Sequence, residues 1–207
     1  ITNNIEHYNT ILKGYETLSS HIKKTLESKC IVNDRLDSKL LEKHQFKCHG
    51  FAWFETYRIS LDQMLKWYNR LNIEGKASEL DGLILASAFS EYTMQMKDGI
   101  MMSQSEILRP LIDFDLIDKD YDFLNLQEIR KVIEFGFSEE LKLKIVDFMY
   151  NGFFPSLGLG DETLEMIQDQ FKKFTDEKIT PFAHEWHLKD ELIPDETLSQ
   201  MAELGVF

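Results

Sequence analysis

Hydrophobic residues recur every three or four positions along most of the chain, which is the period of an α-helix with one buried face. This pattern predicts long helices over about 3–27, 37–71 and 78–99. It predicts two shorter helices over 123–135 and 138–150. No segment alternates polar and apolar residues convincingly, as a half-buried strand does. The sequence therefore predicts an all-α fold whose first part is a bundle of five or six helices.

Capping residues and glycines mark the expected helix ends. Asn3 with Glu6, and Ser78 with Asp81, have the spacing of an N-terminal capping box. Gly136 is expected to lie between the last two helices. Small residues in the helix over 78–99 would let a neighbouring helix approach closely. We expect the buried side of that helix to carry Leu80, Leu83, Ile84, Ala88 and Tyr92.

The segment 99–110, GIMMSQSEILRP, combines soft methionine side chains with polar ones, which suits an adaptable contact surface. Ser103 and Glu106 form a second capping box, expected to start a short turn that Pro110 stops. Arg109 is expected to pair with a carboxylate, either Glu106 or one elsewhere in the protein. The candidate interface residues are Met102, Ser103, Gln104, Glu106 and Arg109.

A domain boundary is expected at 151–160, NGFFPSLGLG, which holds three of the ten glycines and one of the four prolines. The chain then divides into a helical extension (1–150), this linker, and a second part (161–207). A second stretch, 112–122, is crowded with carboxylates and is expected to be a solvated connector. The organisation predicted is therefore bundle, linker and a separate C-terminal helical segment.

Composition removes several classes of function. The net charge of −13 falls entirely in residues 111–207, which have 22 acidic and 9 basic side chains. Neither half offers the basic surface that a phosphate backbone needs, so we expect no nucleic-acid partner. No uncharged apolar run reaches 18 residues and no secretory signal precedes the first helix, so we expect a cytoplasmic protein without a membrane span. The chain does not begin with Met, so processing or truncation is expected.

Residues 30–49 hold cysteine and histidine side chains of the kind that bind zinc. His44 and Cys48 are four residues apart and would share a helix face, with His49 adjacent. Cys30 is distant in sequence, and no Cys-x-x-Cys pair is present. We therefore expect two buried free cysteines, with neither a metal site nor a disulfide framework.

The acidic connector has part of the residue pattern of a calcium-binding loop. Asp118, Asp120 and Asp122 stand at positions 1, 3 and 5 of an EF-hand-like count. The sixth position should be Gly and is Phe123, and the twelfth should be Glu and is Ile129. Two indispensable positions fail, so the connector is not expected to bind calcium.

Two other patterns lack the features that their chemistry requires. His184 and His187 could share a helix face, but they lack the H-E-x-x-H order of a zinc protease. Gly158 and Gly160 precede a helix, but the third glycine of a dinucleotide loop is replaced by Thr163 and no strand comes before. We therefore assign no catalytic, cofactor-binding or metal residue in this chain.

The segment 161–207 has the clearest markers of helix starts and ends in the chain. Asp161 can cap a helix, Pro181 is expected to break it, Pro194 opens the next and Gly205 ends that one. The first of these helices has one apolar face, formed by Leu164, Ile167, Phe171 and Phe174.

The order of features in this segment is specific. Along it stand Phe171, Phe174, Glu177, Pro181, Ala183, Glu185, Trp186, Ile193, Pro194 and the run Ala202–Phe207. This order resembles the start of the acyl-CoA dehydrogenase family. The run Gly99–Pro110, with Ala52-Trp53 and Glu91-Tyr92 upstream, is similar to the N-terminal extension of methylsuccinyl-CoA dehydrogenases.

The resemblance implies that the full-length protein is an FAD-dependent dehydrogenase. Such an enzyme desaturates an acyl-CoA thioester between its α and β carbons and passes the electrons to an electron-transfer flavoprotein. The family's flavin contacts and catalytic base would lie beyond position 207, so residues 1–207 are expected to be a non-catalytic N-terminal fragment that binds no FAD. A homo-oligomer is also expected.

Two further expectations concern contacts. The first helices of the family's domain need cover from later ones, so we expect self-association or packing on the extension to bury five side chains: Phe171, Phe174, Trp186, Leu198 and Phe207. The alternative to a dehydrogenase is an all-helical adaptor whose Met-rich segment binds a protein partner.

Overall fold

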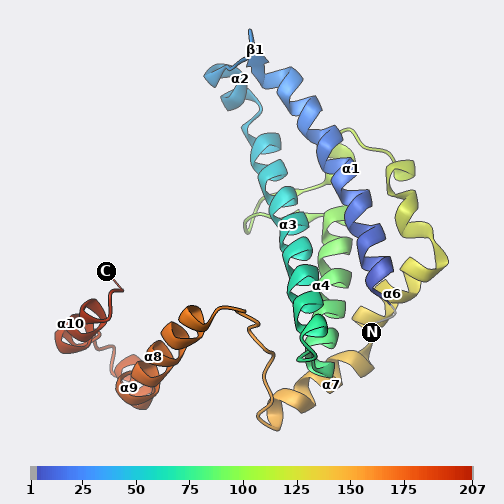
Figure 1. Ribbon diagram of the computed structural model, residues 1–207. Coiled ribbons are helices and arrows are strands. Elements are labelled where there is room, and N and C mark those ends of the chain that lie inside the picture. Colours follow the sequence, from blue (N-terminus) through green and yellow to red (C-terminus); the bar gives the residue numbers. More distant parts are fainter. Residues whose placement is uncertain (1–3, 207) are drawn as a thin grey trace. The chain divides into compact units, whose positions relative to one another are not determined.

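The computed structural model describes residues 4–206 and is predominantly helical (Figure 1), which confirms the all-α prediction. The chain divides into two compact units, one ending at Ser156 and one beginning at Leu157. This division falls inside the predicted linker segment 151–160. The cap predicted at Asn3 lies outside the described residues.

The first unit contains three long helices and several short ones. The long helices are α1 (Ile5–Cys30), α3 (Gln45–Ile73) and α4 (Glu79–Asp98). The short ones are α2 (Ser38–Lys43), α5 (Pro110–Asp113), the 3-10 helix η2 (Asp118–Asn125), α6 (Gln127–Phe137) and α7 (Glu139–Tyr150). Two hairpins of two-residue strands join them: β1 (Ile31–Val32) with β2 (Arg35–Leu36), and β3 (Ile100–Met101) with β4 (Ile107–Leu108).

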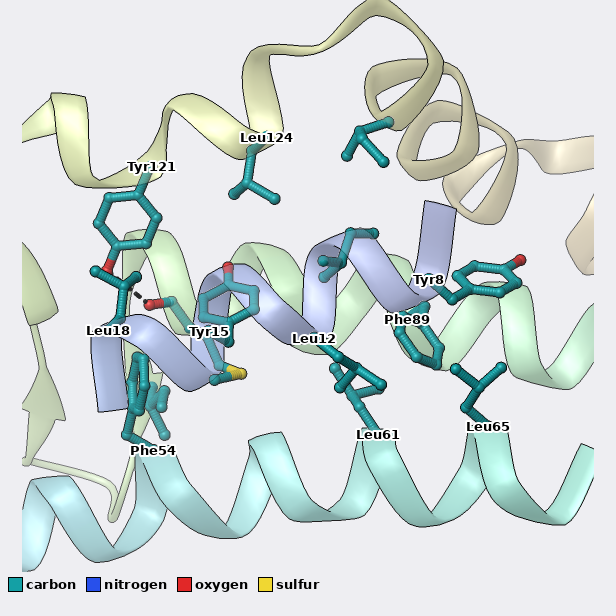
Figure 2. Close-up of a cluster of buried hydrophobic side chains, with 14 of the residues drawn as sticks. Tyr8, Leu12, Tyr15, Leu18, Phe54, Leu61, Leu65, Phe89, Tyr121 and Leu124 are labelled. Atoms are coloured by element: carbon teal, nitrogen blue, oxygen red, sulfur yellow. Dashed lines mark hydrogen bonds between the residues drawn. The ribbon is translucent and has the colours of Figure 1, made fainter. Parts of the chain in front are cut away.

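The core of this unit is built around α1, which packs against α3 and η2. Leu12, Tyr15 and Leu18 of α1 lie between side chains of α3 and of η2, and Tyr8 packs against Phe89 of α4 (Figure 2). The hydroxyl of Tyr15 donates a hydrogen bond of 2.6 Å to the carbonyl oxygen of Thr93. Burial raises the pKa of Tyr15 well above its ordinary value, so the hydroxyl stays a neutral donor inside the core.

Helix α4 is enclosed on more than one side, because it packs against α3, α6 and α7. The single buried face predicted for it was therefore incomplete: Leu85 and Phe89 are fully buried, whereas Ala88 and Tyr92 are half-buried. Ile84 is also half-buried. A helix with neighbours around its circumference has apolar residues around its circumference, so no single stripe identifies the core side.

The close approach of α4 and α6 depends on Gly136. The two predicted helices are present, but their boundary is at Ser138, and Gly136 is the last-but-one residue of α6 instead of lying between them. A Cβ atom at Gly136 would collide with the hydroxyl oxygen of Ser90 and the carbonyl oxygen of Ala86. Small side chains on α4 thus face the glycine of α6, which confirms that the small residues of α4 serve a helix crossing.

The acidic stretch 112–122 is not the solvated connector that its charge suggested. Phe114, Leu116 and Tyr121 are at most 5% exposed and belong to the core. Asp120 accepts a hydrogen bond of 2.8 Å from the backbone N–H of Ile117 and so caps η2. Most of the carboxylates are exposed, while Phe114, Leu116 and Tyr121 between them are buried. The overall composition of the segment suggested a solvated loop because it does not reflect this alternation.

The helix predicted over 37–71 is in fact two helices. Asp37 caps α2, since its Oδ1 accepts hydrogen bonds of 2.9 Å from the N–H groups of Lys39 and Leu40. The chain leaves α-helical geometry at His44, which ends α2 and precedes α3. The interruption is a single residue and has no Gly or Pro beside it. The hydrophobic pattern therefore continues across it, and the sequence predicts one helix.

The second unit contains α8 (Glu162–Lys178), α9 (Thr180–Leu188) and α10 (Asp195–Glu203). Asp161 caps α8 as predicted, accepting from the N–H groups of Thr163 and Leu164. Pro181 lies in the first turn of α9, so it begins a helix as well as following one. Within the described part of this unit, Thr197 is the one buried residue.

None of the described helices is both long enough and apolar enough to cross a membrane.

Candidate interface and its anchoring contacts

The predicted interface segment forms a β-hairpin whose base is buried and whose tip is exposed. Ile100 pairs with Leu108 and both are fully buried, whereas Met101 is 65% exposed. Leu108 packs closely on Gly50 of α3, where a Cβ atom would come within 2.5 Å of its Cδ1. The hairpin is therefore fixed to the core at one end and presents polar and methionine side chains at the other.

The capping residues at the tip stabilise this hairpin turn and not a helical turn. Ser103 Oγ accepts a hydrogen bond of 3.1 Å from the N–H of Glu106, and it donates one of 3.2 Å to Glu106 Oε2. One bond of the predicted capping box is formed, from the Glu106 N–H to Ser103 Oγ, but the Ser103 N–H donates to the Glu106 carbonyl oxygen and not to its carboxylate. Met102 is half-buried, while Ser103, Gln104 and Glu106 are exposed.

Arg109 lies at the exit of the hairpin and is exposed. Its backbone N–H donates a 2.6 Å hydrogen bond to Asp113 Oδ2, and its guanidinium lies against Gly99. Within residues 4–206 its side chain forms no ion pair, so the local pairing with Glu106 weighed above is not formed. Pro110 follows as the first residue of α5, so it starts a helical turn instead of stopping one.

The carboxylate of Asp81, predicted only as a helix cap, is buried and also connects α4 to the linker segment 151–160. Asp81 is fully buried, and its Oδ2 accepts bonds of 2.8 Å from both the N–H and the Oγ of Ser78. Its Oδ1 accepts a 3.1 Å bond from the N–H of Ser156. The carbonyl oxygen of Ser156 in turn accepts a 2.9 Å bond from Trp67 Nε1. Both backbone groups of Ser156 are thus held by the bundle.

A second surface of the first unit is apolar and exposed. Along α7 and just after it, six large hydrophobic side chains are between 48% and 89% exposed: Leu143, Val146, Met149, Tyr150, Phe153 and Phe154. Spacings of three and four residues place Leu143, Val146 and Tyr150 on one face of α7. Clusters of this kind on protein surfaces mark contact sites. Sequence periodicity identified α7 but not which face the bundle would leave uncovered.

The structure brings the two cysteines together and leaves the histidines apart. Cys30 was expected to be remote from Cys48, but their Sγ atoms lie 3.8 Å apart, so that expectation was wrong. His44 ends α2, and His49 Nε2 accepts a 3.0 Å hydrogen bond from Trp53 Nε1. Among residues 4–206, no three His, Cys, Asp or Glu side chains gather as a metal site would require.

The remaining motif residues have ordinary structural positions. His184 and His187 are exposed on α9. Gly158 and Gly160 have positive φ values of 57° and 64° in an irregular segment that does not follow a strand. This is not the strand–loop–helix arrangement that binds dinucleotide phosphates, so these glycines do not fit an FAD site.

Comparison with known proteins agrees with the C-terminal motif. Residues 161–207 match the sequence profile of "Acyl-CoA dehydrogenase, N-terminal domain". The chain is also 39% identical over 201 residues to a (2S)-methylsuccinyl-CoA dehydrogenase of Cereibacter sphaeroides. That match covers 95% of this chain and 35% of the relative, so the chain spans about a third of the relative's length. Both findings confirm the resemblance predicted from the sequence.

Proposed function

We propose that this chain is the N-terminal part of an FAD-dependent enzyme of the acyl-CoA dehydrogenase family, because residues 161–207 match that family's N-terminal domain. The proposed reaction is α,β-desaturation of an acyl-CoA, with methylsuccinyl-CoA as the first substrate to test. The observation that carries the proposal is the 39% identity, which extends through 95% of the chain and so includes the bundle as well as residues 161–207. FAD would accept the hydride, and an electron-transfer flavoprotein would take the electrons onward.

In the proposed enzyme, residues 4–206 would form assembly contacts and would carry out no catalytic step. In the bundle, most large polar side chains are exposed, and the buried Asp81 is fully occupied by Ser78 and Ser156. The hairpin tip and the exposed face of α7 are the surfaces available for assembly. We therefore propose that the extension shapes an interface in a cytoplasmic homo-oligomer, with Met102, Ser103, Gln104, Glu106 and Arg109 at one contact.

Residues 1–207 alone are expected to bind no FAD and to leave acyl-CoA unchanged. The glycine segment before α8 lacks phosphate-binding geometry, and the family's flavin contacts are expected further along the chain. The measurement is the visible absorbance of the chain purified after incubation with excess FAD. A stoichiometric flavin spectrum that survives gel filtration would contradict this prediction.

Arg109→Ala in the full-length enzyme is expected to lower thermal stability or assembly and to leave flavin reduction largely intact. Its guanidinium forms no ion pair within the described residues. In the proposed interface it would pair with a carboxylate, and the substitution removes that pair. The cost is about 0–1 kcal/mol for an exposed pair and several times more for a buried one.

The readouts for Arg109→Ala are the melting temperature, the oligomeric state and the rate of flavin reduction by substrate. Arg70→Ala is a matched control, because Arg70 is exposed near the end of α3 and away from the hairpin. Loss of flavin reduction with unchanged melting and assembly would place Arg109 in the active site and refute the interface role.

A further inference from the structure

The two cysteines of the chain form a close thiol pair at one end of the bundle. Cys30 is the last residue of α1, and Cys48 lies in the first turns of α3. Their sulfur atoms are 3.8 Å apart, with Cys30 buried and Cys48 half-buried. The two cysteines are eighteen positions apart in sequence, and β1, β2 and α2 lie between them. The pair is therefore located where this segment leaves α1 and enters α3.

The backbone segments that carry the two thiols are held together independently of them. Lys29 and Lys47, the residues immediately before each cysteine, both reach Asp115 Oδ2 at 3.6 Å. The backbone N–H of Asp37 also donates a 2.9 Å hydrogen bond to the carbonyl oxygen of Cys30. These contacts hold the two backbone segments beside each other, and the sulfur atoms must approach from 3.8 Å to about 2.0 Å to form a disulfide.

A surface cavity of about 170 Å³ gives access to the pair. Both cysteines line it together with apolar side chains and with Lys23 and Glu27. Two of the apolar residues, Ile31 and Leu36, are 40% and 61% exposed, so the cavity is open to solvent on that side. The half-buried Cys48 is the more accessible of the two sulfurs.

We propose that Cys30 and Cys48 form a reversible disulfide by exchange with a low-molecular-weight disulfide such as oxidised glutathione. The Cys48 thiolate attacks one sulfur of the small disulfide, giving a mixed disulfide and releasing one small thiol. Cys30 then loses its proton and attacks Cys48 Sγ, which forms the internal disulfide and expels the second small thiol. Two protein thiols are oxidised and one small disulfide is reduced.

The exchange is slow at neutral pH and accelerates as the pH rises. Burial, together with the neighbouring Cys30 thiol, raises the pKa of Cys48 above its ordinary value. Less of Cys48 is then the attacking thiolate at pH 7 than in a free cysteine, and the fraction grows with increasing pH.

The test uses the full chain equilibrated at pH 8.5 with glutathione buffers of increasing oxidised fraction. We expect both free thiols to disappear together, with the mass falling by two hydrogens. Because the disulfide closes the loop between α1 and α3, the melting temperature should rise by roughly 5–10 °C. Adding reduced glutathione should restore both thiols and the original melting temperature.

Single-cysteine variants distinguish a coupled thiol pair from two thiols that react independently. Cys30→Ser should stop at a stable glutathione adduct on Cys48. Cys48→Ser should react many-fold more slowly, because the remaining sulfur is buried. The proposal is overturned if wild-type protein accumulates the glutathione adduct without losing the Cys30 thiol. It is equally overturned if the internal disulfide forms only after denaturation.

Discussion

Asp81→Ala is expected to lower the free energy of unfolding of the bundle by about 2–4 kcal/mol, because it removes a buried carboxylate with three partners. Asp81 closes the capping box of α4 with Ser78 and also accepts from the N–H of Ser156. Without it, the N–H groups of Ser78 and Ser156 lose their acceptors, and a cavity remains at a fully buried position. Urea unfolding followed by circular dichroism measures the change.

Glu79→Ala is the matched control for Asp81→Ala. Glu79 lies in the same first turn of α4 but is exposed, and its contact with Lys144 is 3.7 Å long between half-exposed side chains. Its loss should cost less than about 1 kcal/mol. Proteolysis near Ser156 gives an independent readout, since only Asp81→Ala should expose this segment to faster cleavage. Equal, small effects of the two variants would contradict the structural role assigned to Asp81.

Gly136→Ala is expected to destabilise the bundle by about 2–3 kcal/mol or more, although alanine favours helices more than glycine does. The new Cβ atom would lie 2.6 Å from Ser90 Cβ and closer still to the carbonyl oxygen of Ala86. Backbone atoms cannot rotate away, so α4 and α6 must separate and lose apolar packing along the whole contact. Chemical unfolding measures the cost, with a change in near-ultraviolet circular dichroism as a sign of repacking.

Glu134→Ala in the same helix controls for helix propensity. Glu134 is exposed, and replacing it should change the unfolding free energy by only a few tenths of a kcal/mol. If Gly136→Ala were as stable as the wild type, α4 and α6 would not approach as closely as described. The small residues of α4 would then have no role in the crossing.

Features set by short-range chemistry were predictable from the sequence. The bonds that Ser78 and Asp81 exchange, and those that Asp161 accepts, depend on residues two or three positions apart. The bond from the Glu106 N–H to Ser103 Oγ was also predicted, but the same spacing serves helical and hairpin turns. Local bonding alone did not distinguish the two, and the buried partners Ile100 and Leu108 selected the hairpin.

Features set by distant contacts were not predictable in this way. The contact of Trp67 with Ser156 joins positions 89 residues apart, and that of Asp81 with Ser156 joins positions 75 apart. The approach of Cys30 to Cys48 depends on how the chain folds between them. A single sequence carries no direct signal for such pairs. The family resemblance was visible because it rests on the order of residues along one short segment.

The most direct test of the account is the visible spectrum of the full-length protein encoded by the gene that contains this sequence, before and after anaerobic addition of methylsuccinyl-CoA. We predict a bound-flavin spectrum with about one FAD per chain, which bleaches when substrate is added. A full-length protein that carries no flavin would contradict the assignment to an FAD-dependent dehydrogenase and would favour the all-helical adaptor.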